Sequence, residues 1–117
     1  MNYSVLVLEP AKEFLSQLEP KLRAKAFRTI GLLADFGQIL SLPHSRKIAG
    51  TEKLYELRVK QATNICRLFY FFKGSGVFVV LSGFVKKTDR TDRNEIERAQ
   101  RLMQQFMEEE DEHGKNL

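Results

Sequence analysis

The sequence is short of the residues that most often perform chemistry in proteins. Its 117 residues include one cysteine, Cys66, and two histidines, His44 and His113. A single cysteine cannot form a disulfide within the chain, and no familiar zinc-site spacing joins these three residues. Cys66 lies in the apolar segment ICRLFYFF, where a buried and unreactive thiol is the expected role. The composition therefore argues against a metal site and against a catalytic cysteine.

Long apolar runs are also missing. No run approaches the roughly 20 residues that a membrane helix requires, and the opening MNYSVLVLEPAKEF has neither a basic n-region nor a cleavage-site pattern. With 43% hydrophobic and 29% charged residues, the composition is ordinary for a globular protein of one domain. We therefore expect a cytoplasmic protein with a single core, no membrane contact and no second domain.

Acidic residues are scarce everywhere except at the end of the chain. Residues 108–117 hold five acids and one cation, a net −4, which leaves +8 on residues 1–107. A body this basic suits a polyanionic partner such as nucleic acid. We predict one folded domain over 1–107 and an acidic, frayed tail over 108–117. The alternative is that the tail covers the basic surface when RNA is absent.

The first third of the chain predicts one strand and two helices. The β-branched run Tyr3–Leu8 is typical of a strand. Pro10 and Pro20 each stand where a helix tolerates proline, in its first turn, and apolar residues follow both at helical spacing, with Gly37 as a stop. The second helix carries four cations, which a solvated face explains better than phosphate binding: Lys21, Arg23, Lys25 and Arg28.

The rest predicts three sequential strands and a last helix. Leu54–Lys60 alternates, with Glu56, Arg58 and Lys60 on its wet face, whereas Ile65–Phe72 is apolar on both faces except for Arg67. Val77–Phe84 returns after a turn, and Thr91 or Asp92 caps the last helix. Residues 37–53 read as a loop with a brief extended piece at Arg46–Ile48.

This order, β-α-α-β-β-β-α, predicts the α+β class. We expect a mostly antiparallel four-stranded sheet, with a helical hairpin on one face and a C-terminal helix.

Arg67 is the most informative residue of the predicted site. A guanidinium in a central strand stays charged and is costly to bury alone. It therefore either pairs with an acid, most obviously Glu56 on the neighbouring strand, or points into a basic site. Arg58 projects on the same side as Glu56 and is expected to approach Arg67. Lys86 and Lys87 leave the last strand nearby, and crowding of cations depresses lysine pKa values.

RNA cleavage is one reaction that such a site can perform without metal or cofactor. RNA supplies its own nucleophile, the 2′-OH, so a protein need only move protons and neutralise charge on the phosphate. We take Arg58, Arg67, Lys86 and Lys87 as catalytic candidates. Aromatic rings stack on splayed bases, although a place in the core explains each ring here better. The candidate RNA-binding residues are Lys60, Phe69, Phe84 and Arg90. The spacing of these residues is equally compatible with a domain that binds nucleic acid without cutting it.

Four blocks of the sequence resemble a known family. They are LYELR at 54–58, CRLFYFF at 66–72, LSGFVKKT at 81–88 and EIERA at 95–99. In this order they resemble the phage-derived HigB-type branch of the RelE/ParE toxin superfamily. The resemblance implies a RelE-like fold and a toxin of a type II toxin–antitoxin pair. Such toxins are typically mRNA interferases that cut translated messages on the 70S ribosome, and a helix-turn-helix antitoxin neutralises them.

The resemblance also assigns roles to residues. Arg58 and Arg67 match the two strand arginines of the motif, and Lys86 and Lys87 match its lysine pair. It implies that Arg67 binds the phosphate and its transition-state charge, that Arg58 positions RNA, and that one lysine transfers a proton. Glu56 is the expected orienting acid.

Two positions depart from the family pattern. Many relatives have a histidine in place of Ser82 and a proline in place of Asp92. Asp caps a helix equally well, but the loss of the histidine removes an acid–base group. Two alternatives therefore stay open, a gyrase poison of the ParE kind and a catalytically silent module that binds RNA or an antitoxin.

Overall fold

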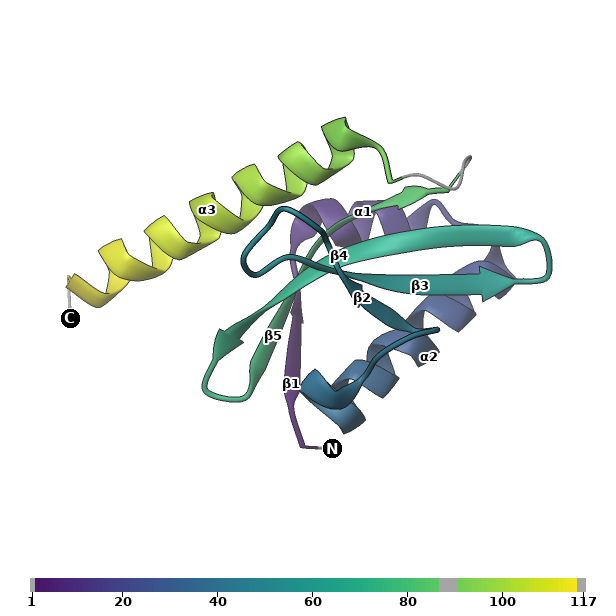
Figure 1. Cartoon of the computed structure of the whole chain (residues 1–117), viewed down its shortest axis with the longest axis horizontal. Coiled ribbons are helices and arrows are strands. Elements are labelled where there is room, and N and C mark those ends of the chain that lie inside the picture. Colours follow the sequence, from purple (N-terminus) through teal and green to yellow (C-terminus); the bar gives the residue numbers. More distant parts are fainter. Residues whose placement is uncertain (1, 87–90, 116–117) are drawn as a thin grey trace.

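The strand β4 (Asn64–Gly74) lies at the centre of the molecule. The structure is a computed structural model that describes residues 2–86 and 91–115, with side chains as far as residue 112. Two predicted site residues, Lys87 and Arg90, lie outside the described residues. The remaining elements, shown in Figure 1, are β1 (Ser4–Val7), α1 (Glu9–Ser16), α2 (Pro20–Phe36), η1 (Gly37–Ile39), β2 (Ser45–Lys47), β3 (Tyr55–Gln61), β5 (Val77–Val85) and α3 (Arg93–Lys115).

The strands form one mixed sheet in the order β1-β5-β4-β3-β2. β1 runs parallel to β5, and every other pair is antiparallel. The predicted α+β class and helix order are confirmed, but the sheet has five strands rather than four. The extra strand is the extended piece near Arg46, which pairs with β3 through Arg46↔Glu56 and its two neighbours. The sequence predicted an extended piece here, at Arg46–Ile48, but a three-residue strand has no hydrophobic periodicity of its own, so its pairing with β3 was not predicted.

Helices cover both faces of the sheet, as Figure 1 shows. α1 and α2 pack on one face, where Leu57, Leu68 and Phe78 are buried. α3 crosses the other face and covers Phe69, Phe71 and Val79. From Cys66 to Phe71 every residue of β4 is buried, which confirms the prediction of a central strand covered on both sides.

The helix starts follow the predicted signals. Pro20 opens α2, and the carboxylate of Glu19 accepts hydrogen bonds from the backbone N–H of Lys21 and Leu22, both at 3.2 Å. Gly37 follows the last residue of α2 with φ +60°. At the third helix it is Asp92 that caps, since its Oδ1 accepts from the N–H of Asn94 at 2.8 Å.

α3 continues to Lys115, so the segment from 108 to 115, predicted as a frayed tail, is helical. Lys73 on β4 ties this part of the helix to the sheet, because its Nζ forms an ion pair with Oε1 of Glu110 at 3.0 Å. At about 1.5 Å per residue the helix is roughly 34 Å long, and its acidic residues lie at the opposite end of α3 from Arg93 (Figure 1). The alternative in which the acidic end covers the predicted site is therefore not the arrangement seen. In the described part of the chain no helix is long and apolar enough to cross a membrane.

Candidate nucleic-acid interface

Two arginines face each other across the middle of the sheet. The register pairs Arg58 of β3 with Arg67 of β4, and Arg67 with Phe84 of β5. On the other side the backbone N–H of Arg58 donates to the carbonyl of His44 at 2.8 Å, which extends the β2–β3 ladder by one residue. His44, Arg58, Arg67 and Phe84 thus form one cross-strand row, about 14 Å wide at the usual strand spacing.

A second row lies one step farther along the same face. Lys60 pairs with Ile65, and the backbone N–H of Lys86 donates to the carbonyl of Ile65 at 2.9 Å. Because side chains alternate along a strand, Lys60 lies on the same face as Arg58, and Lys86 on the same face as Phe84. The two rows together are called the basic end of the sheet: His44, Arg58, Lys60, Ile65, Arg67, Phe84 and Lys86.

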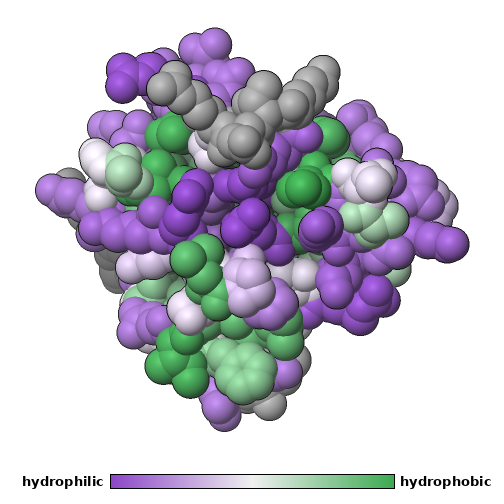
Figure 2. Space-filling model, turned by 45° about the vertical axis from the view of Figure 1, so that its right-hand side comes forward, coloured by the Kyte–Doolittle hydropathy of each residue, from purple (hydrophilic) through white to green (hydrophobic). Residues whose placement is uncertain are grey.

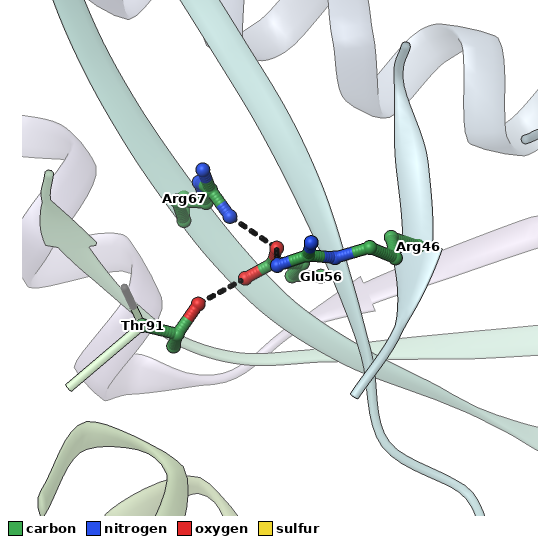
Figure 3. A network of polar contacts seen from close by, with 4 residues as sticks. All are labelled: Arg46, Glu56, Arg67 and Thr91. Carbon is green, nitrogen blue, oxygen red and sulfur yellow. Dashed lines mark hydrogen bonds and ion pairs between the residues drawn. The ribbon is translucent and has the colours of Figure 1, made fainter. Parts of the chain in front are cut away.

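A buried glutamate organises the charges behind the first row (Figure 3). Glu56 is fully buried, and its Oε1 accepts hydrogen bonds from Nη1 of Arg67 and, at 2.9 Å, from Nη2 of Arg46. Its Oε2 accepts from the hydroxyl of Thr91 at 3.1 Å. One acid therefore holds together β2, β3, β4 and the segment that leads into α3. This is the Arg67–Glu56 ion pair that the sequence suggested, with two further partners.

Arg67 itself is 2% exposed. Its Nε is buried and has no hydrogen-bond partner among the described residues. The prediction that Arg67 binds the phosphate directly does not describe this conformation, because the Glu56 pair and the surrounding side chains close it off from solvent. Arg58 is only partly buried and makes no side-chain ion pair with any described residue, so it is the arginine that faces outward.

The two aromatic candidates, Phe69 and Phe84, also differ in how much of the side chain is exposed. Phe69 is 1% exposed and belongs to the core under α3, so neither of its faces is open to a base. Its prediction as an RNA-stacking residue is replaced by a structural role. Phe84 is partly exposed and stacks on Phe69 with ring centroids 5.4 Å apart. Of the two rings, only Phe84 has surface left for a base.

His44 is the residue that sequence reasoning missed. In the sequence it lies in a loop between Pro43 and Ser45, with no pattern to mark it. It lies in the turn just before β2, and its backbone carbonyl accepts a hydrogen bond from the N–H of Arg58 at 2.8 Å, so the two residues are neighbours across the end of the β2–β3 pair. The signal that would have found it is the pairing of β2, which no local pattern predicted.

Other reactive groups of the described residues lie elsewhere. Cys66 is fully buried on the α1/α2 side, and burial raises the pKa of its thiol to about 12, so no thiolate forms near neutral pH. Burial likewise raises the pKa of Tyr70, against a hydrogen bond with Ser45 that lowers it. Among the described residues no three histidine, cysteine or acidic side chains are close enough to hold a metal ion.

Figure 2 shows hydrophilic residues over most of the face it presents, with apolar patches between them. Two hollows of about 540 and 290 Å³ lie under the second half of α3, next to Lys53, and neither includes Arg58 or Arg67. The basic end is therefore distinct from both hollows, and its cations are of the kind that bind a polyanion.

A family model matches most of the chain. The family described as "Phage derived protein Gp49-like (DUF891)" matches residues 13–104. A search of curated proteins finds no significant match.

Solved structures share the fold at low sequence identity. A mutant of the E. coli toxin RelE in the free state is 19% identical, with 71% of this chain and 82% of that chain covered and a TM-score of 0.57. RelE in the intact E. coli RelBE toxin–antitoxin complex is 21% identical, with 75% and 99% covered and a TM-score of 0.57. The archaeal RelE–RelB complex from Pyrococcus horikoshii OT3 is 17% identical, with 78% and 100% covered and a TM-score of 0.52. The fold is therefore RelE-like.

Proposed function

The chain belongs to the phage derived protein Gp49-like family, and from this premise we propose that it is the toxin of a type II toxin–antitoxin pair, of the HigB type. The RelE-like fold supports the proposal, since two of the similar structures are toxin–antitoxin complexes. Its partner would be a cognate antitoxin with a helix-turn-helix, and both would act in the cytoplasm.

The proposed activity is that of a metal-independent endoribonuclease that cuts messenger RNA on the translating 70S ribosome. The observation that carries it is the pairing of Arg58 with Arg67 in the middle of the sheet, where Arg46, Lys60 and Lys86 add further positive charge. Like charges directly opposite each other destabilise a sheet, and among the described residues Glu56 is the one buried acid beside them. An excess of cations that the fold does not need is what phosphate recognition requires.

In the mechanism we infer, Arg58 contacts the scissile phosphate directly. Arg67, which is buried beside it, contributes its positive charge to the same site. The 2′-OH of the RNA attacks the adjacent phosphorus while a base takes its proton, and the leaving 5′-oxygen receives a proton. Negative charge grows on the phosphate, and fixed cations stabilise it without reorganising. Glu56 holds Arg67 in place, and the exposed surface of Phe84 stacks a splayed base.

We assign one proton transfer to His44, with Lys86 or Lys87 as the second group. Histidine is the side chain that most often performs this role, and His44 stands beside Arg58, where the phosphate would lie. Replacing His44 with Ala should lower the single-turnover cleavage rate by about 10²- to 10⁴-fold and leave ribosome affinity unchanged. The rate should also lose one limb of its pH profile. A variant with an unchanged pH profile would contradict the assignment and return both transfers to the lysines.

The activity itself is tested by brief induction in a bacterial host. New 5′ ends are mapped on a translated message and on the same message without its start codon. We expect new ends on the translated message alone, together with growth arrest. Arrest without new ends, accompanied by DNA-damage signalling, would point instead to a gyrase poison. Neither arrest nor new ends would leave a binding module, and Ser82 would be the first position to restore to histidine.

A further inference from the structure

The hydroxyl of Thr91 is not used at the start of α3. The sequence left open whether Thr91 or Asp92 caps this helix, and it is Asp92 that does so, since its Oδ1 accepts from the N–H of Asn94. Thr91 instead donates its hydroxyl to Oε2 of Glu56 at 3.1 Å. Among the described residues Thr91 is the only side chain that donates to this oxygen. The residue before α3 is therefore tied to the buried acid of the candidate site.

Arg67 forms a weaker pair with this acid than its burial would favour. Arginine and a carboxylate commonly pair at two points, through two parallel N–H···O bonds. Here only Nη1 of Arg67 donates to Glu56, and it does so to Oε1, which also accepts from Arg46 at 2.9 Å. The Nε of Arg67 is buried and has no hydrogen-bond partner among the described residues. Figure 3 shows the other nitrogens of this guanidinium turned away from the carboxylate.

The bond from Thr91 and the missing bond of Arg67 have a common explanation in the orientation of the carboxylate. An unmade hydrogen bond is costly in a low-dielectric interior. A carboxylate free to turn would therefore offer its second oxygen to the unpaired N–H of Arg67. In Glu56 that second oxygen already has a donor, Thr91, which lies on a different side of the carboxylate from Arg67 (Figure 3). The threonine thus competes with the arginine for Oε2.

We propose that Thr91 is a positioning residue of the cleavage site. By holding Oε2 of Glu56 it prevents a two-point pair with Arg67 and leaves more of the positive charge of Arg67 to act on the phosphate. This rests on the proposed function, in which Arg58 contacts the phosphate and stands opposite Arg67 in the sheet. Fixed positive charge stabilises the negative charge that grows on the phosphate, and a counter-ion bound at two points would weaken that effect.

The test compares two substitutions of Thr91 that remove different parts of its side chain. Thr91→Val keeps the shape and removes the hydroxyl, whereas Thr91→Ser keeps the hydroxyl and removes a methyl group. Single-turnover cleavage of a message on purified 70S ribosomes is measured over a range of protein concentrations. In Thr91→Val the maximal rate should fall by about 10- to 100-fold, less than for the loss of a whole donor. The half-saturating concentration should stay the same, because only the transition state loses an interaction.

The serine variant and a control at another threonine show whether the hydroxyl is responsible. Thr91→Ser should restore most of the rate. Thr51→Val is the matched control, because Thr51 is also partly buried and its hydroxyl donates to the carbonyl of Ile48 at 2.7 Å, in the loop before β3. This control should cut as the wild type does. Urea unfolding of each sample shows that the fold is kept.

A second measurement reports on the pairing of Arg67 and does not depend on cleavage. The Nε–H group of Arg67 gives its own signal in the ¹H–¹⁵N spectrum. In Thr91→Val a new hydrogen bond to Glu56 should move the proton of this signal downfield and slow its exchange with water. The same signal should stay in place in Thr51→Val.

Two results would overturn the inference and leave the proposed function standing. One is a wild-type rate in Thr91→Val. The other is an equal fall in the valine and serine variants with a lower urea midpoint in both, which would give Thr91 a structural role alone. Wild-type protein that does not cleave would instead count against the proposed function. The Nε–H signal of Arg67 then decides: no shift in Thr91→Val overturns the inference, and a downfield shift supports control of the pair by Thr91.

Discussion

Replacing Glu56 with Gln should lower the free energy of unfolding by about 3–5 kcal/mol, the cost of breaking a buried ion pair from one side. Glutamine has nearly the same shape but no charge, so the 2%-exposed Arg67 would keep its positive charge without a counter-ion. Arg46 and Thr91 would also lose the carboxylate that ties β2 and the start of α3 to the sheet. Urea unfolding followed by circular dichroism measures the change. Because a domain of this size has roughly 5–15 kcal/mol in total, much of its stability would be lost.

Two further variants separate this explanation from a general sensitivity to mutation. Glu52→Gln removes an exposed acid from the loop before β3, and we expect a change within about 0.5 kcal/mol. The double variant Glu56→Gln/Arg67→Met removes both charges and should recover a large part of the loss. Equal destabilisation in the single and double variants would show that the cost does not come from the unpaired arginine.

Replacing Arg58 with Ala should lower the cleavage rate by about 10²- to 10³-fold, the usual effect of removing one donor to a developing negative charge. Stability should not fall with it. Arg58 makes no side-chain ion pair with a described residue and stands opposite another arginine, so its removal relieves a repulsion worth about 0.2–1 kcal/mol. Single-turnover cleavage of a message on purified ribosomes, with the unfolding curve of the same sample, measures both. Activity that falls while stability is kept or gained identifies a functional residue.

Lys47→Ala is the matched control for Arg58. It removes one cation from β2, but alternation places Lys47 on the opposite face of the sheet from Arg46, so cleavage should be nearly unchanged. Arg58→Lys should be intermediate, because it keeps the charge and loses the planar fork that holds a phosphate at two points. A rate in Arg58→Ala within about threefold of the wild type would remove Arg58 from the site. Arg67→Ala is a poor substitute for this test, since it would uncouple Glu56 and disturb the fold.

Features of Arg67 that depend on its neighbours in the sequence were predicted, whereas features that depend on segments far apart in the chain were not. The pattern around Arg67, a single charge in an apolar strand, was sufficient to predict a central strand, and it gave a pair with Glu56 as one of two alternatives for the arginine. It was not sufficient to predict that Arg67, paired with Glu56, would be only 2% exposed, and that Arg58 would be the less buried of the two facing arginines. Phe69 shows the same limit, because an apolar alternating strand does not tell which of its faces a distant helix will cover.

What the sequence determined by itself was whatever depends on near neighbours: proline and glycine at the ends of α2, a cap at Thr91 or Asp92, the two-sided burial of β4 and the basic charge of the body. Tertiary structure decided the rest. β2 exists only because β3 offers it a ladder of hydrogen bonds, and that pairing brings His44 to Arg58 across a loop of unremarkable composition. Local propensity acts over a few residues, whereas strand pairing and helix packing depend on interactions between segments far apart in the chain. The arrangement of the site therefore depends on the tertiary structure.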